Sequence, residues 1–205
     1  MYNVSVMRTV KETKEKKEKK TPAERTRDVV YVALFAALIS VCSYLTVPTV
    51  IPFTLQTFGI FVTLGLLGGK RGTAAVLCYV LLGAFGLPVF SGFRGGIAVL
   101  GGPTGGYIAG FVVSALVYWG ITALLGDKLL VKCLAMVVGL VAVYAFGTAW
   151  FVFVMGKSSP VTVGYALSVC VVPFIPFDCA KIALALFMSK VLFKAVNRNM
   201  KKARG

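Results

Sequence analysis

Charged side chains are nearly absent from the middle of this chain. Between residues 29 and 189, only nine of 161 positions carry a charge. They are Lys70, Arg71, Arg94, Asp127, Lys128, Lys132, Lys157, Asp178 and Lys181. The whole 205-residue chain is 58% hydrophobic, with a mean hydropathy of +0.87. Only 14% of its residues are charged, against about 25% in an ordinary soluble domain. We therefore predict an integral membrane protein.

Six apolar stretches are long enough, or nearly so, to cross a membrane as helices. They cover residues 29–47, 53–69, 72–90, 103–125, 130–156 and 172–195. We predict an all-α integral membrane protein with six transmembrane helices, of which the second is short. Residues 29–195 form the transmembrane domain, between a charged tail at 1–28 and a basic tail at 196–205. The apolar segment 161–171 is too short to span and predicts a loop or a half-helix.

The distribution of basic residues predicts the orientation. With six spans, four basic regions fall on one side of the membrane. They are the N-terminal tail, the connection with Lys70 and Arg71, the connection with Lys128 and Lys132, and the C-terminal tail. Basic connections stay in the cytoplasm, so we expect both termini there. The net charge of +15 then reflects orientation and contact with anionic membrane lipid. It is not read as a sign of nucleic-acid binding.

The sequence carries no pattern of an enzyme, a metal site or a cofactor site. It has no histidine, and its five cysteines form no CxxC pair, so a zinc site is not expected. HExxH and GxSxG are both missing. The GLLGGK stretch at 65–70 is one residue short of a phosphate loop, and Arg71 stands where a serine or threonine is needed.

Asp178 and Lys181 lie three residues apart in the last apolar run. A charge at the centre of a membrane helix costs about 2.5–3.5 kcal/mol, and such residues usually have a functional partner. The spacing places both on one helix face, so a self-neutralising pair with no further role is the alternative. Arg94 falls on the same predicted outer side, with no acid near it in sequence. The three residues together predict a binding site that faces outward.

Glycine is concentrated between residues 92 and 110, where it occurs eight times. Glycine permits turns that expose backbone groups to a ligand, but it also permits close helix packing in membranes. For Gly105, Gly106 and Gly110 the two interpretations are equally open. For Gly95 and Gly96, which follow Arg94, we favour ligand or loop geometry.

Five motifs occur in an order that resembles a known family. They are IPFTLQTF at 51–58, LLGGKRG at 66–72, YVLLGAFGLPVF at 79–90, GGPTGGYIAGF at 101–111 and PFDCAK at 176–181. The chain resembles the biotin-specific substrate-binding subunits (S components, the BioY family) of energy-coupling factor (ECF) vitamin transporters. The resemblance implies six helices with cytoplasmic termini, in the cell membrane of a prokaryote. It also implies high-affinity biotin binding from outside, and as partners a transmembrane coupling subunit and two cytoplasmic ATPases.

The same resemblance implies a docking surface on the first helix. The family commonly carries small residues at Ala-x-x-x-Ala spacing there, and Ala33 and Ala37 fit that pattern, with Ala36 beside them. Ordinary packing within the helix bundle is the alternative for these alanines.

Biotin presents a ureido ring, an apolar thioether ring with its chain, and a carboxylate. We predict that Asp178 accepts a hydrogen bond from a ureido N–H, and that Arg94 or Lys181 meets the carboxylate. Further hydrogen-bonding candidates are Thr54, Gln56 and Tyr107. Contacts between helices are the alternative for the first two, and an interfacial aromatic anchor for Tyr107. Candidates for the apolar wall are Phe90, Phe93 and Phe177.

Two other functions remain open from the sequence. An S component for another small vitamin would share the fold and the small residues of the first helix. A stand-alone transporter or channel often shows related halves, and the sequence has no convincing repeat of this kind.

Overall fold

Helices dominate the structure, a computed structural model that describes residues 21–49, 51–157 and 161–202. The long helices are α2 (Pro22–Tyr44), α3 (Gln56–Ala84), α5 (Gly105–Leu125), α6 (Leu129–Met155) and α8 (Ile175–Lys202). The short ones are α4 (Ile97–Gly101) and α7 (Val163–Cys170). The predicted helical class is confirmed, and the half-helix expected within 161–171 is α7.

A two-stranded ribbon, which was not predicted, joins α2 to α3. Its strands are β1 (Thr46–Val47) and β2 (Phe53–Thr54), paired antiparallel with Thr46 opposite Thr54. The ribbon ends α2 at Tyr44, before the predicted boundary at 47. It also places Thr54 directly before the start of α3.

The start of α2 is fixed by its cap rather than by hydropathy. Thr21 Oγ1 accepts a hydrogen bond from the backbone N–H of Glu24, and the Glu24 carboxylate accepts one from the N–H of Thr21. This reciprocal capping box, with Pro22 at the first helical position, begins the helix before the apolar stretch starts at residue 29. The Lys/Glu-rich part of the tail, residues 10–20, lies outside the described residues, as do residues 203–205.

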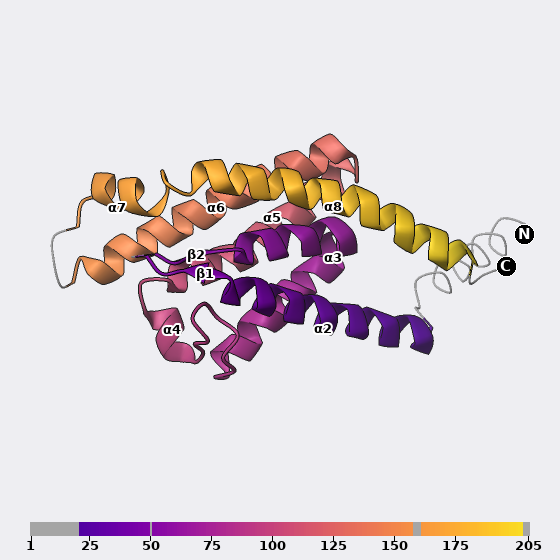
Figure 1. Cartoon of the computed structure of the whole chain (residues 1–205), viewed down its shortest axis with the longest axis horizontal. Helices are drawn as coiled ribbons and strands as arrows, with labels where there is room; N and C mark the ends of the chain where they lie inside the picture. Colours follow the sequence, from indigo (N-terminus) through magenta and orange to yellow (C-terminus); the bar gives the residue numbers. More distant parts are fainter. Residues whose placement is uncertain (1–20, 50, 158–160, 203–205) are drawn as a thin grey trace, which may run out of the picture.

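The helix α3 reverses direction within its length. Gly68 has non-helical angles, φ 76° and ψ 177°, a conformation that glycine adopts at little cost. Gln56 Nε2 donates a hydrogen bond of 2.7 Å to the hydroxyl of Tyr79. In an unbroken helix these two residues would lie about 35 Å apart along the axis. The first arm of α3 (56–67) and the second arm (69–84) therefore run back along each other (Figure 1).

The reversal affects the number of membrane spans. By length and composition, four described helices can cross a membrane: α2, α3, α5 and α6. The pair α7 and α8, bent by 48°, adds a fifth if it counts as one span. The sequence predicted six because it took 53–69 and 72–90 as separate spans. In the structure the helical parts of these two stretches are the arms of α3, which ends at Ala84, and each arm is shorter than the 20 or so residues of an ordinary span.

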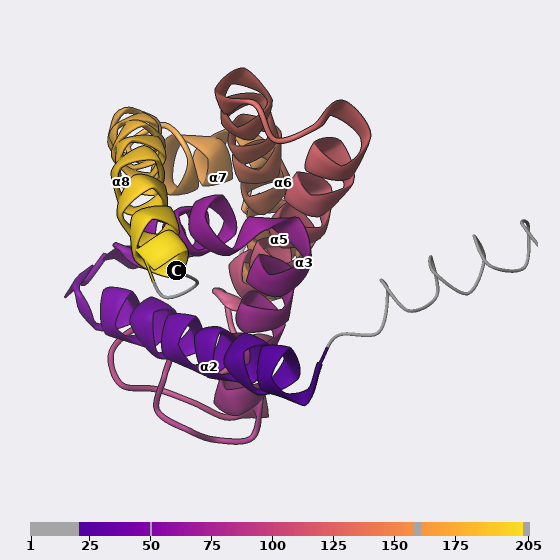
Figure 2. The same ribbon diagram turned by 90° about the vertical axis from the view of Figure 1, so that its right-hand side faces the viewer.

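The first arm lies at the centre of the bundle, between α2, α8 and the α5–α6 pair (Figure 2). Close packing of α5 against α6 depends on two glycines of the predicted glycine-rich stretch. A Cβ atom on Gly106 would lie 2.2 Å from the Cβ of Trp150, and one on Gly110 would lie 2.9 Å from the Cα of Val143. The distances favour the packing interpretation for these two glycines.

Different elements lie at the two ends of the bundle. The start of α2, the reversal in α3 and the α5–α6 connection lie at one end (Figure 1). Arg71 and Asp28 form an ion pair of 2.8 Å there, and Lys132 and Asp127 form one of 3.1 Å. The ribbon, α4 and α7 lie at the other end.

Candidate binding site

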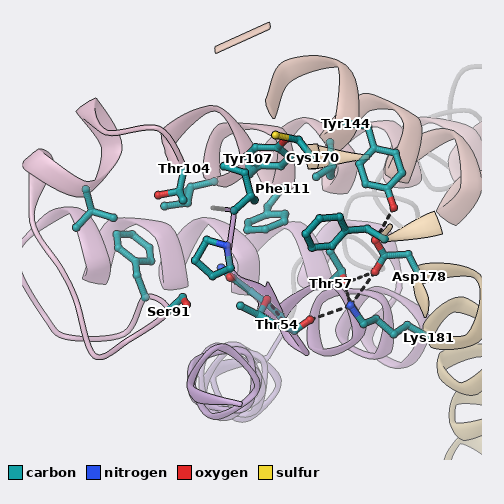
Figure 3. Close-up of a pocket in the computed structure, with 18 of the residues that line it drawn as sticks. Thr54, Thr57, Ser91, Thr104, Tyr107, Phe111, Tyr144, Cys170, Asp178 and Lys181 are labelled. Atoms are coloured by element: carbon teal, nitrogen blue, oxygen red, sulfur yellow. Dashed lines mark hydrogen bonds and ion pairs between the residues drawn. The ribbon is translucent and has the colours of Figure 1, made fainter. Parts of the chain in front are cut away.

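A cavity opens at the end of the bundle that carries α4, α7 and the ribbon. Its empty volume, including the open mouth, is about 680 Å³. Apolar side chains form much of its wall, among them Ile51, Phe90, Ile108, Phe111, Val143 and Phe174. Polar groups gather at its two ends (Figure 3).

At one end, Asp178 and Lys181 form the predicted ion pair. The Lys181 Nζ lies 2.8 Å from the Asp178 Oδ1, and the two residues are only 2% and 7% exposed. Asp178 lies in the first turn of α8, where the helix dipole stabilises a carboxylate. The pair is therefore buried and oriented by the helix that carries it.

Two further helices hold Asp178 in place. The Thr57 hydroxyl of α3 donates a hydrogen bond of 3.0 Å to Oδ1, and the Tyr144 hydroxyl of α6 donates one of 2.6 Å to Oδ2 (Figure 3). A buried carboxylate needs such partners to offset its lost hydration. Asp178 is thus the point at which α3, α6 and α8 meet.

All three protons of the Lys181 ammonium group have acceptors inside the protein. They point to the Thr54 carbonyl at 2.8 Å, the Thr57 Oγ1 at 3.2 Å and the Asp178 Oδ1 at 2.8 Å. Lys181 also lies 4.3 Å from the ring centroid of Phe53, close enough for a cation–π interaction. An ammonium group has three donors in total, so these acceptors already occupy the hydrogen-bonding capacity of Lys181.

Arg94 lines the other end of the cavity and is exposed. Its Nε donates a hydrogen bond of 3.2 Å to the carbonyl of Ser91. Figure 3 shows Ser91 and Thr104 across the cavity from Asp178 and Lys181. The cavity therefore combines a buried ion pair at one end with a guanidinium group at its mouth.

The predicted hydrogen-bonding residues Thr54, Gln56 and Tyr107 all line the cavity, but they differ in the hydrogen bonds that they already make. Gln56, 4% exposed, donates its Nε2 proton to Tyr79, and its backbone N–H donates to the Thr54 hydroxyl at 3.2 Å. Tyr107 is 8% exposed, and its hydroxyl has no hydrogen-bond partner among the described residues. Tyr107 lies beside Cys170 (Figure 3), and its hydroxyl oxygen is buried.

Gly95 and Gly96 do not line the cavity. A Cβ on Gly95 would lie 2.1 Å from the Leu87 carbonyl oxygen. Gly96 has φ 94°, and its N–H donates to the Gly83 carbonyl at 2.7 Å. Both glycines shape the segment between α3 and α4, and an effect on ligand binding stays a prediction.

Among the aromatic candidates for the wall, Phe90 lines the cavity, whereas Phe93 and Phe177 are exposed and do not. The sequence interpretation missed Thr57, Ser91, Thr104, Phe111, Tyr144 and Cys170. A usable signal existed for Tyr144, because a hydroxyl deep within an apolar span requires a partner. The described residues contain no cluster of three His, Cys, Asp or Glu side chains that could hold a metal ion.

The alanines predicted for docking face outward from α2. Ala33 and Ala37 are exposed, whereas Ala36 is buried in the bundle. They share this exposed face with large apolar residues such as Leu34 and Val41, 61% and 57% exposed.

Comparison with known proteins decides the family. The model of the BioY family matches residues 12–198. The chain belongs to the BioY family. The resemblance seen in the five motifs is thereby confirmed. The biotin transporter BioY of Thermotoga maritima is 40% identical over 169 residues, which cover 82% of this chain and 96% of that protein. The probable biotin transporter BioY of Pyrococcus horikoshii is 37% identical over 169 residues, 82% of this chain and 97% of the other.

A solved structure supports the BioY assignment at the level of the fold. The crystal structure of the S component for biotin from an ECF-type ABC transporter superposes with a TM-score of 0.76 at 28% identity. The match covers 86% of this chain and 95% of that one. The family assignment does not test the predictions on individual site residues, which rest on the geometry described above.

Proposed function

We propose that this protein binds biotin in the cavity and serves as the biotin-binding subunit of a membrane uptake system. The observation that carries the proposal is the division of the cavity into two polar ends with apolar walls between them. Asp178, held by three side chains, lies at the buried end, and Arg94 lies at the mouth. Biotin has the matching order of groups: a ureido ring, an apolar middle and a carboxylate.

At the buried end, Asp178 accepts a ureido N–H. A carboxylate offers about four acceptor positions. Thr57, Tyr144 and Lys181 occupy three of them. The remaining position lies on Oδ2, which is bonded only by Tyr144. A further hydrogen bond from the Tyr107 hydroxyl, whose oxygen is buried, requires this side chain to shift when the ligand binds.

At the mouth, Arg94 meets the ligand carboxylate. Both Arg94 and Lys181 fit this role from the sequence, but the three Lys181 protons already have acceptors. Arg94 has five N–H donors in a planar fork, and one bond of its side chain, to Ser91, is described. This difference favours Arg94 as the residue that recognises the carboxylate, and it gives Lys181 the role of holding Asp178.

The remaining predicted residues support this arrangement. Thr54 contributes its carbonyl to Lys181, and its hydroxyl accepts from Gln56. Gln56 ties the two arms of α3 together through Tyr79. Gly95 and Gly96 act indirectly, through the shape of the segment that carries Arg94.

The proposal includes six spans with both termini in the cytoplasm of a prokaryotic cell. Although each arm of α3 is shorter than an ordinary span, the reversal at Gly68 makes each arm one crossing in this proposal, and α7 with α8 counts as another. The position of Arg71 and Lys132 at the end of the bundle opposite the cavity supports this orientation, since basic connections stay inside. The cavity then faces outward.

Energy for uptake would come from partners, a transmembrane coupling subunit and two ATPases. The exposed face of α2 around Ala33 and Ala37 is the proposed docking surface, because small residues let another helix approach closely. The basic tails suit contact with anionic lipid.

The deciding experiment is isothermal titration of the detergent-purified protein with biotin, with riboflavin and thiamine as controls. The expected result is saturable binding of biotin alone. Saturable binding of a different vitamin would change the assigned substrate and leave the assigned fold unaffected. Absence of binding by folded protein would favour a stand-alone transporter or channel. Biotin uptake by cells with and without the coupling subunit and ATPases tests the energy source separately.

A further inference from the structure

Arg94 ends a tight turn whose backbone is held in an unusual conformation. The N–H of Phe90 donates to the carbonyl of Arg94 at 2.9 Å and closes the turn. Phe93, directly before Arg94, has φ 57° and is the one described residue other than glycine with a positive φ. Left-handed backbone is unfavourable for a side-chain-bearing residue, and it persists where the surroundings hold it in place.

The end of α2 supplies the surroundings that hold this turn. The ring of Phe93 stacks on Tyr44, with centroids 4.2 Å apart and planes 24° apart. The hydroxyl of Tyr44 donates to the carbonyl of Pro88 at 2.9 Å. Tyr44 therefore contacts the chain just before the turn through its hydroxyl and within the turn through its ring.

Neighbouring residues of the same region add further links. The hydroxyl of Ser43 bonds to the Val89 carbonyl at 2.6 Å, and those of Thr46 and Ser91 lie 2.9 Å apart. On the inner side, the ring of Phe90 is 2% exposed and packs edge-on against Tyr79. The turn is thus fixed in the core by Phe90 and on the outside by Phe93.

Neither Tyr44 nor Phe93 lines the cavity. An effect of these rings on ligand binding must therefore pass through the turn, and the residue of the turn that offers charged donors to the cavity is Arg94.

We propose that Tyr44 and Phe93 are positioning residues that hold Arg94 at the cavity mouth. Through Arg94, the pair sets the preference for ligands with a free carboxylate over ligands whose carboxylate is blocked. The inference rests on the proposed function, in which Arg94 recognises the carboxylate of biotin. Phe93 is 66% exposed, so anchoring at the membrane interface is the competing role for its ring.

The test compares biotin with biotin methyl ester, which lacks the negative charge. In Phe93→Ala, the affinity for biotin should fall about tenfold, the size of one charge-assisted hydrogen bond. The affinity for the ester should stay within about twofold of wild type, since the ester has no charge for Arg94 to recognise. Arg94→Gln should show the same pattern. The double variant Phe93→Ala with Arg94→Gln should bind biotin only slightly more weakly than either single variant, because the effects of residues that act through one contact are not additive.

Three variants separate positioning from folding and from interface anchoring. Phe93→Gly removes the ring, and glycine adopts the left-handed backbone without strain. This variant therefore measures the effect of losing the ring on biotin binding in a protein whose turn is not strained. Phe85→Ala is the matched control, since Phe85 begins the same connecting segment and is 83% exposed. It should bind both ligands like wild type. Tyr44→Phe keeps the stack, loses the bond to Pro88, and should show a smaller selective loss for biotin.

Equal losses for biotin and the ester in Phe93→Ala and Phe93→Gly would overturn the positioning role, as would unchanged binding of both. A total loss of biotin binding free energy in the double variant equal to the sum of the two single losses would also overturn it. If wild type binds neither ligand, the proposed function fails, and this inference fails with it. If wild type binds biotin but Arg94→Gln binds both ligands normally, the function stands and the role given to Arg94 and its positioning pair is wrong.

Discussion

The Tyr144 hydroxyl of α6 donates a hydrogen bond of 2.6 Å to Oδ2 of Asp178 on α8. Tyr144 is half-buried and lines the cavity. The oxygen that it contacts is the one that does not bind Lys181. Tyr144 therefore orients the carboxylate and leaves room on the same oxygen for a ligand donor.

Removal of this hydroxyl should weaken biotin binding without unfolding the protein. Tyr144→Phe loses one charge-assisted hydrogen bond, so the affinity measured by titration should fall about tenfold. The control is Tyr118→Phe, because Tyr118 is 1% exposed and its hydroxyl has no partner among the described residues. Equal affinities in wild type and Tyr144→Phe would contradict the role of Tyr144.

Thr57 bridges both charges of the ion pair, since it donates to Asp178 and accepts from Lys181. Thr57→Val keeps the shape of the side chain but removes both bonds, so it should destabilise the fold by about 1–3 kcal/mol. Thermal unfolding in detergent would show this as a lower melting temperature.

The control for Thr57 lies on the same arm of α3. Thr63 is fully buried, and its hydroxyl donates to the Gly59 carbonyl of its own helix at 2.7 Å. Thr63→Val should therefore have a much smaller effect. Similar melting temperatures for the two variants would show that the bridge contributes nothing beyond ordinary packing.

Asp178→Asn leaves Lys181 as a buried cation without its counter-ion, which should cost about 3–5 kcal/mol of stability. Adding Lys181→Met removes that cation and should restore much of the melting temperature. Biotin binding should stay lost in this double variant, because the acceptor for the ureido N–H is absent. Wild-type affinity in the folded double variant would refute the assignment of Asp178.

Gly68→Ala tests the reversal in α3. At φ 76° and ψ 177°, a backbone region open essentially to glycine alone, an alanine should cost about 1–3 kcal/mol, so the melting temperature should fall. Gly120 is the matched glycine: it lies within α5, has no positive φ, and has open space where a Cβ would be. Gly120→Ala should leave stability unchanged or raise it. A Gly68→Ala protein as stable as wild type would argue against the reversal.

Rare charges made three residues of the candidate site stand out in the sequence. Asp178, Lys181 and Arg94 stand out because an apolar span excludes charge unless it has a partner. Their distribution over the two ends of the cavity was not predictable, because hydropathy does not say which donors are already occupied. The three bonds of Lys181 became visible only when Thr54 and Thr57 were placed beside it.

Neutral polar residues were harder to interpret. Thr57 resembles Thr63 in sequence, but one reaches across to α8 and the other bonds within its own helix. The difference depends on tertiary packing, which a local pattern does not contain. The same limit applies to α3: Lys70 and Arg71 marked the end of a span, but they did not indicate that Gly68 alone would turn the chain.

The ion pair of Asp178 and Lys181 has a consequence for electrical work. Because the charges of Asp178 and Lys181 sum to zero, Arg94 carries the one unbalanced charge among the described residues that line the cavity. A bound monocarboxylate such as biotin brings the sum to zero. Carrying one charge through a membrane potential requires about 2.3 kcal/mol per 100 mV. A movement of the loaded site through the membrane field would therefore be electrically silent, whereas the empty site would feel the potential through its arginine.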